Sequence, residues 1–145
     1  MLKLIGNIIW LLLGGLWAAV GYAIAGLILL LPIITIPFAI QAFKLARYTL
    51  WPFGSRLVPA VESPVHGVLA ILGNIIWFVL VGIWMAIFHV VAALLNAITI
   101  IGLPFAWAHL KLAGVSLVPF GFRVVDEYEA AALGASGGIS VQRIG

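Results

Sequence analysis

The sequence predicts an all-α integral membrane protein built from two tandem repeats. Of its 145 residues only 7 are Lys or Arg and 4 are Asp or Glu, whereas about 25% of a soluble domain is charged. The stretches 4–43 and 63–110 hold no such residue, and each exceeds the roughly 20 apolar residues that cross a bilayer. Because lipid offers the backbone no hydrogen-bond partner and the stretches lack strand-like alternation, we expect helices.

An internal duplication is the second observation behind this fold class. Residues 6–58 align with residues 73–125 without a gap at an offset of 67, and 25 of the 53 pairs are identical. A period this long in units this apolar indicates a duplicated membrane protein rather than a soluble solenoid. The chain divides into repeat 1 (1–58), a linker (59–72), repeat 2 (73–125) and a polar, partly flexible tail (126–145).

Each repeat is expected to begin with a long transmembrane helix of about 25 residues. These helices run from Gly6 to about Leu31 and from Gly73 to about Ile98. Lys3 followed by an apolar run resembles a secretory signal. The same segment recurs inside the chain, where no signal can lie, so we expect it to remain as a mature helix.

A break and a short second helix complete each repeat. Pro37, and Gly102 with Pro104, interrupt the apolar runs. The second helices are expected to end near Leu50 and Leu117, at Pro-Phe-Gly. At about 14 residues such a helix is too short to cross alone. It either lies amphipathically in the membrane interface or returns part-way as a re-entrant arm.

The distribution of basic residues favours one topology. If each short helix returns the chain to its starting side, all seven Lys and Arg residues share one face. The positive-inside rule makes that face cytoplasmic. A single crossing per repeat would leave no such bias. We therefore expect a multi-pass membrane protein with both termini in the cytoplasm.

Small residues recur four apart in both long helices. Gly15 with Ala19, and Gly82 with Ala86, occupy matching positions. Such pairs let helices approach closely in lipid, so we expect them to pack helices within or between chains.

Tryptophan and asparagine also recur at fixed positions. Trp10 and Trp17, matched in repeat 2, lie seven apart and are expected on one helical face as interfacial anchors; an aromatic pore is the alternative. Asn7 and Asn74 suit helix N-caps, or else an inward-facing polar ring in an oligomer.

Two pairs of cations are shared by the repeats. Lys44 and Lys111 lie in the helical parts. A lysine within a membrane segment is a candidate for a functional pathway, whereas a lysine on an interfacial helix extends to the headgroups and binds anionic lipid. Arg56 and Arg123 follow the Pro-Phe-Gly stops and are most simply cytoplasmic anchors.

Three polar residues belong to repeat 2 alone. His89, Asn96 and His109 stand where repeat 1 has Tyr22, Leu29 and Ala42. His89 and Asn96 share a face with Gly82. Such residues more often form single interhelical hydrogen bonds, and a proton relay is the alternative.

Catalytic and nucleic-acid signatures are absent from the sequence. The histidines lack metal-ligand spacing, and no nucleophile and base pair, phosphate loop or dinucleotide fingerprint is present. The few basic residues are not interleaved with aromatic residues in the manner of a nucleic-acid binder. We expect no enzyme, no metal, no cofactor and no nucleic-acid partner.

A series of short motifs occurs in an order typical of one family. In repeat 2 the series is GNIIW from Gly73, GIW from Gly82, His89, ITIIGLP ending at Pro104, KLA from Lys111, PFG from Pro119 and RVV from Arg123. With the matching motifs of repeat 1, the chain resembles the YccF-type inner membrane component domain. The resemblance implies a small bacterial inner-membrane protein with tandem domain copies and implies no activity. Repeat 1 departs from it by having Thr35 at the Gly102 position.

The function expected from the sequence is that of a homo-oligomeric membrane protein, as a pore or passive permeation unit whose site lies at the interrupted helices. The alternative is an accessory, scaffold or anionic-lipid-binding subunit. The sequence names no protein partner.

Overall fold

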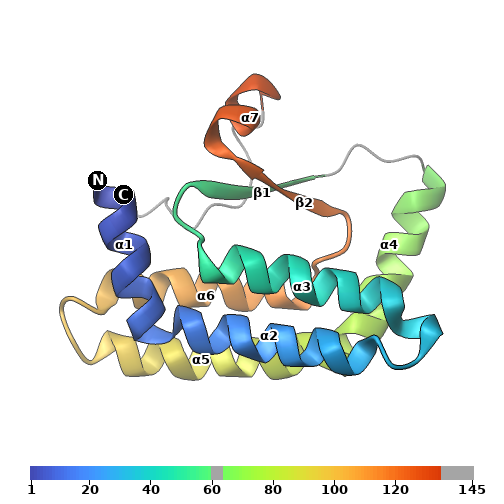
Figure 1. Ribbon diagram of the computed structural model, residues 1–145, viewed down its shortest axis with the longest axis horizontal. Helices are drawn as coiled ribbons and strands as arrows, with labels where there is room; N and C mark the ends of the chain where they lie inside the picture. The colour runs from blue at the N-terminus through green and yellow to red at the C-terminus, as the bar shows by residue number, and fades with distance from the viewer. Residues whose placement is uncertain (60–63, 135–145) are drawn as a thin grey trace.

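The computed structural model describes residues 1–59 and 64–134. Each repeat contributes an upright helix and a helical hairpin, and a two-stranded ladder with one short helix lies over both hairpins (Figure 1). The elements are α1 (Leu2–Trp10), η1 (Leu11–Gly15), α2 (Leu16–Leu29), η2 (Ile33–Thr35), α3 (Ile36–Leu50), β1 (Ser55–Pro59), α4 (Pro64–Trp77), η3 (Phe78–Gly82), α5 (Ile83–Ala97), α6 (Leu103–Leu117), β2 (Phe122–Asp126) and α7 (Glu127–Ala132).

The long apolar helix of each repeat turns a corner, which corrects the expected straight helix. Leu2–Leu29 and Gly67–Ala97 are long and apolar enough to cross a membrane by length and composition. However, α1 stands upright whereas α2 runs across the molecule (Figure 1). The change occurs in the π-helical turn η1, where Gly14 has φ +132°. A π-turn and a glycine are recognised causes of sharp kinks. In repeat 2 the direction changes around the π-helical turn η3.

The breaks and second helices lie where the sequence predicts them. Pro37 and Pro104 occupy the first turns of α3 and α6, which end at Leu50 and Leu117. The two breaks differ in form. Repeat 1 makes the 3₁₀ turn η2, whereas in repeat 2 the Thr99 hydroxyl accepts from Gly102 N at 3.0 Å. A Cβ at Gly102 would collide with Asn96 O and Thr99 Oγ1, so this turn requires glycine.

The segments after the two Pro-Phe-Gly motifs pair as an antiparallel ladder that the sequence analysis did not predict. Ser55 pairs with Asp126, Leu57 with Val124 and Pro59 with Phe122. At the repeat offset of 67, Leu57 and Val124 are equivalent residues. The ladder is therefore symmetric about this central pair, and a pseudo-two-fold axis relates the repeats.

Aromatic packing follows the same two-fold relation. Phe38 meets Phe120 of the other repeat at a centroid distance of 5.4 Å, and the equivalent pair, Phe105 and Phe53, meets at 6.2 Å. The pseudo-two-fold axis is perpendicular to the ladder and runs from it between the two hairpins. Rotation about this axis leaves the ladder side of each repeat on the ladder side. The two repeats are therefore related as parallel copies and not as inverted copies.

Two boundaries from the sequence are revised. Helix α4 begins at Pro64, so the second half of the predicted linker is helical. The predicted flexible tail begins with the end of β2 and with α7, whose first turn is capped by Asp126 accepting from Glu129 N at 2.7 Å. Residues 60–63 of the linker and 135–145 of the tail lie outside the described residues.

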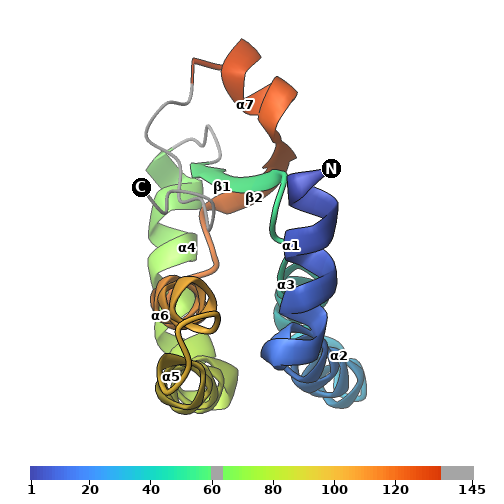
Figure 2. The same ribbon diagram turned by 90° about the vertical axis from the view of Figure 1, so that its left-hand side faces the viewer.

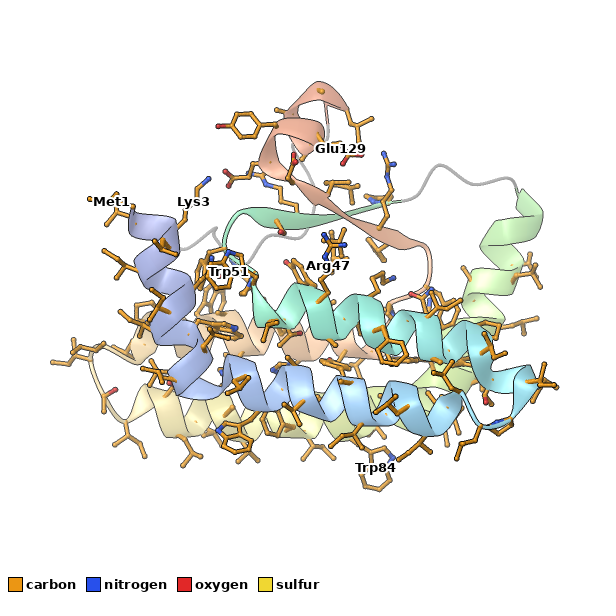
Figure 3. The ribbon with its side chains drawn as sticks, viewed as in Figure 1. Met1, Lys3, Arg47, Trp51, Trp84 and Glu129 are labelled. Atoms are coloured by element: carbon orange, nitrogen blue, oxygen red, sulfur yellow. The ribbon has the colours of Figure 1, made fainter. Side chains whose placement is uncertain are left out.

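The charged side chains gather at one end of the molecule. Figure 2 shows α1 to α3 as one layer and α4 to α6 as the other, with the ladder and α7 above both and α2 and α5 at the opposite edge. Lys3, Arg47 and Glu129 lie on the ladder side, whereas Trp84 points away from it (Figure 3). Neither α2 nor α5 contains Lys, Arg, Asp or Glu. We refer to the ladder side as the charged face and to the α2–α5 side as the apolar edge.

Candidate functional site

The Gly-Asn motif that opens each repeat fixes the Pro-Phe-Gly turn that closes it. Asn7 donates through Nδ2 to Phe53 O at 2.9 Å and accepts from Phe53 N at 3.1 Å. Asn74 makes the same two bonds with Phe120, at 3.2 and 2.9 Å. Asn7 lies within α1, whose N-cap is Met1. The predicted N-cap role is therefore wrong: Asn7 joins the two ends of its repeat.

The repeated glycines of the long helices make room for a tryptophan. A Cβ at Gly15 would collide with the Trp10 indole, which donates to Thr49 O of α3 at 2.7 Å. In repeat 2 a Cβ at Gly82 would lie 3.0 Å from the Trp77 ring, which donates to Ser116 O at 2.7 Å. These glycines allow the long helix to pack on the second helix of its own repeat.

The small residues that pair with these glycines in the sequence are also covered. Ala19 and Ala86 are only 6% and 8% exposed. Association between chains would therefore need a face other than these glycine and alanine pairs.

The tryptophans of each repeat separate onto two faces, in contrast to the prediction of one. Trp10 and Trp77 are fully buried, whereas Trp17 and Trp84 are 67% and 66% exposed. Seven residues return a side chain to the same face of a regular α-helix, but a π-turn intervenes in each repeat. Its extra residue shifts the phase of the helix, and so Trp17 and Trp84 lie on the apolar edge.

The three polar residues found only in repeat 2 converge on the kink of repeat 1. Asn96 donates to Leu13 O at 2.9 Å, and His109 Nε2 lies 3.4 Å from the same carbonyl. His89 Nδ1 lies 2.9 Å from His109 Nδ1. One assignment satisfies these contacts: His109 donates through Nε2 and accepts at Nδ1 from His89. Asn96 and His109 therefore share one target, the Leu13 carbonyl beside Gly14, and His89 contacts His109 behind it.

The kink leaves room for the His109 ring because residue 14 is a glycine. A Cβ at Gly14 would lie 2.8 Å from His109 Nε2. At the equivalent positions the residues are exchanged in size, because Val81 replaces Gly14 and Ala42 replaces His109. The repeats therefore differ at two complementary positions, one on each side of their junction.

A second polar contact crosses the junction nearby. Tyr22 OH and Ser116 Oγ lie 2.6 Å apart, and Ser116 Oγ also donates to Leu112 O. The Tyr22 and His89 rings are 6.1 Å apart. His89 Nε2 is buried with no hydrogen-bond partner among the residues that the structure describes. The junction thus holds a short buried polar cluster whose contacts include hydrogen bonds between helices.

The two matched lysines have different surroundings. Lys44 Nζ donates to Pro119 O at 2.6 Å and to Phe122 O at 2.9 Å, both in the other repeat. Lys111 Nζ lies 5.8 Å from the centroid of the Trp107 ring, within the range of a cation–π contact. The Lys44 ammonium therefore ties α3 to the end of repeat 2 while it stays at the charged face.

A groove of about 450 Å³ runs between α3 and β2 on the charged face. Its cations are Lys44, Arg47 and Arg123, and the other lining residues are Ile40, Gln41, Phe43, Phe122 and Val124. We refer to it as the basic groove. Arg123 also forms an exposed ion pair with Glu129 at 3.5 Å, a type of pair that contributes little energy. The basic groove thus combines three cations with an apolar floor.

Arg56, the counterpart of Arg123, lies on β1 opposite Val125 and does not line the basic groove. Within the described parts of the chain, no three His, Cys, Asp or Glu residues gather as they would to hold a metal ion.

The family model of the YccF inner membrane component domain matches the chain twice, at residues 5–55 and 72–122. The chain belongs to the YccF family. It is 30% identical over 132 residues to inner membrane protein YccF of Escherichia coli strain K12 and to that of Shigella flexneri, covering 87% of this chain and 89% of each relative. No solved structure gives a significant match.

The family match confirms the resemblance seen in the sequence and the two tandem copies. In this YccF family member each match ends at the first residue of a ladder strand, Ser55 or Phe122. One family domain therefore comprises an upright helix, a helical hairpin and the Pro-Phe-Gly turn clamped by asparagine. The strand pairing that joins the two domains begins at the residues where the two matches end.

Proposed function

We propose that this YccF family member is a non-enzymatic inner-membrane component that binds anionic phospholipid headgroups in the basic groove, with its charged face toward the cytoplasm. The groove carries the proposal, because it places three cations beside an apolar floor at one face of a membrane protein.

The chemistry of the groove suits a phosphodiester headgroup. Arginine presents a planar fork that binds phosphate through two hydrogen bonds, and lysine adds a point charge. Each basic residue near an anionic surface contributes about 1 kcal/mol to attraction. The apolar lining, which includes Phe43 and Phe122, suits the first carbons of an acyl chain.

The charge balance of the face supports its orientation. The described part of the chain has the cations Lys3, Lys44, Arg47, Arg56, Lys111 and Arg123 and the acids Asp126, Glu127 and Glu129; of these, Lys3, Arg47 and Glu129 are labelled on this face in Figure 3. Six cations against three acids leave a net charge of +3. The positive-inside rule then favours the cytoplasmic side for this face and for the N-terminus.

The test compares the thermal stabilisation of the detergent-purified protein by short-chain phosphatidylglycerol and by short-chain phosphatidylcholine. We expect a larger rise in Tm with phosphatidylglycerol, and we expect Arg47→Ala and Arg123→Ala to reduce that difference. Arg56→Ala is the matched control, since it removes the same charge outside the groove. An equal effect of all three changes, or none from the groove variants, would count against the proposal.

The pore expected from the sequence has less support. The space between the helices is filled by large side chains, including Trp10, Trp77, Tyr22 and Tyr48, which are at most 1% exposed. A permeation path would therefore have to form between several copies of the chain. Flux through protein-containing liposomes above that of empty vesicles, lost in the Lys44→Ala and Lys111→Ala double variant, would favour permeation instead.

A further inference from the structure

The depth that the upright helices reach is shorter than a bilayer. The helical segment from Leu2 to Gly14, where the chain turns, contains 13 residues, a length of about 20 Å at 1.5 Å per residue. The hydrocarbon core is about 30 Å thick. In repeat 2 the upright helix begins earlier, at Pro64, and the segment from there to Val81, the counterpart of Gly14, contains 18 residues, a length of about 27 Å. Beyond the turn, α2 and α5 run across the molecule rather than deeper (Figures 1 and 2).

The edge farthest from the charged face has no feature of a water-facing surface. Large aliphatic side chains dominate the two turns, where Ile33 and Ile34 are each 84% exposed and Ile100 and Ile101 are 86% and 73% exposed. On α5, Leu94 and Leu95 are 66% and 64% exposed. If this edge emerged on the far side of the membrane, these side chains would meet water.

The turns at this edge also satisfy much of their own backbone, as hydrocarbon requires. In repeat 1 the Thr35 hydroxyl lies 2.6 Å from Leu29 O and 2.8 Å from Pro32 O. Leu31 N donates to Ile28 O. In repeat 2, Leu103 N donates to Thr99 O. The prolines of both breaks have no amide hydrogen to satisfy.

An exposed tryptophan at this edge would ordinarily indicate a membrane–water interface. The indole of Trp84, however, donates to Val79 O at 3.2 Å. Its polar group is therefore satisfied within the protein, and the ring can lie among acyl chains.

We propose that the protein enters the membrane from the charged face only, and that α2, α5 and their turns lie among acyl chains without reaching the opposite surface. The occupant of the apolar edge is the phospholipid acyl chain. The charge distribution favours this orientation, because neither α2 nor α5 contains Lys, Arg, Asp or Glu and because Lys3, Arg47 and Glu129 lie on the ladder side (Figure 3). This topology replaces the multi-pass arrangement expected from the sequence and does not depend on headgroup binding in the basic groove.

Cysteine labelling tests the proposal directly, since the chain contains no cysteine. Single variants Ile34→Cys and Ile101→Cys place a thiol in each turn, and Tyr128→Cys, at a side chain 90% exposed on α7, is the control. A membrane-impermeant maleimide is added to spheroplasts and to inverted inner-membrane vesicles. We expect Tyr128→Cys to react in inverted vesicles only, and the turn variants to react only after detergent is added. Reaction of either turn variant in spheroplasts would overturn the proposal.

A depth measurement separates a turn buried in lipid from one shielded at the far surface. A spin label at Ile34→Cys or Ile101→Cys in liposomes should collide readily with oxygen, which concentrates in the hydrocarbon, and rarely with a water-soluble nickel chelate. The label at Tyr128→Cys should show the reverse. Greater accessibility of a turn label to the nickel chelate than to oxygen would contradict entry into the membrane from the charged face only.

Discussion

Leu57 and Val124 pair across the ladder, and they are the same position of the two repeats. A residue that pairs with its own equivalent lies on a two-fold axis. The chain is thus organised as a dimer of two covalently joined YccF domains, with the ladder as their symmetric joint. The polar residues at the junction break this symmetry, because Asn96 and His109 contact the kink of repeat 1 beside Gly14, a position that is Val81 in repeat 2.

The asparagine clamps are expected to contribute equally to stability in both repeats. Asn7→Ala and Asn74→Ala each leave an amide and a carbonyl of the Pro-Phe-Gly turn without a partner. We expect each to lower the free energy of unfolding by about 2 kcal/mol, measured by denaturation in mixed micelles with rising SDS fraction. Ile8→Ala, at a neighbouring side chain 49% exposed, is the control and should change little. A neutral effect of both asparagine changes would argue that the clamps are incidental.

Gly14 is expected to tolerate alanine poorly for two separate reasons. Its φ of +132° strains any other residue, and the added Cβ would meet His109 Nε2 at 2.8 Å. Gly14→Ala should therefore cost more than about 3 kcal/mol. Gly54→Ala isolates the first reason, since Gly54 has φ +110° and a Cβ added there would have no other atom within 4 Å, and it should cost about 1 to 2 kcal/mol. Equal losses in the two variants, by the same denaturation assay, would show that the contact with His109 has no cost.

The asymmetric junction is expected to behave as one unit. Gly14→Val, Asn96→Leu and His109→Ala each install the residue found at the equivalent place in the other repeat, and each alone should destabilise the protein. Together they restore matched sizes and remove the donors to Leu13 O. We expect the triple variant to lose about 1 to 3 kcal/mol less than the sum of the three single losses. Strict additivity in denaturation midpoints would refute this coupling.

The buried and exposed tryptophans are expected to differ in their effect on stability. Trp10→Phe and Trp77→Phe remove the indole hydrogen bonds to Thr49 O and Ser116 O, and we expect each to cost about 1 to 2 kcal/mol. Trp17→Phe and Trp84→Phe keep an aromatic ring at the apolar edge and should change stability by less than about 1 kcal/mol. Thermal unfolding in one detergent compares all four. A larger loss at Trp17 than at Trp10 would mean that the apolar edge is buried by another chain.

A second basic groove is expected from one substitution. The counterpart of Arg47 is Gly114, which has open space around its Cβ position. Gly114→Arg adds a third cation to the region of Lys111 and Arg56. If the proposed headgroup site is correct, this variant should increase the stabilisation by phosphatidylglycerol relative to phosphatidylcholine, and Gly114→Gln should not. An equal response of the two variants would assign the effect to side-chain size rather than charge.

Much of the architecture follows from the sequence alone. The charge-free stretches and the duplication predict membrane helices in two copies, since neither a soluble surface nor chance produces them. Pro37, Pro104 and the Pro-Phe-Gly motifs predict where the second helices begin and end, because proline and glycine act locally on the backbone. The polar residues restricted to repeat 2 also indicate a special site, although not its target.

Only the tertiary structure decided the features that depend on contacts between distant segments. A glycine in an apolar helix does not by itself predict a kink. Gly14 adopts its positive φ beside the Leu13 carbonyl, which Asn96 and His109 contact. The ladder joins two five-residue segments that lie 67 residues apart, and such pairing has no local signal. The sequence predicts that Asn7 is a helix cap, and only the structure shows that it is hydrogen-bonded to Phe53. Local backbone preferences are set by neighbouring residues and can be read from the sequence, whereas these contacts are set by how the two repeats pack around their shared axis.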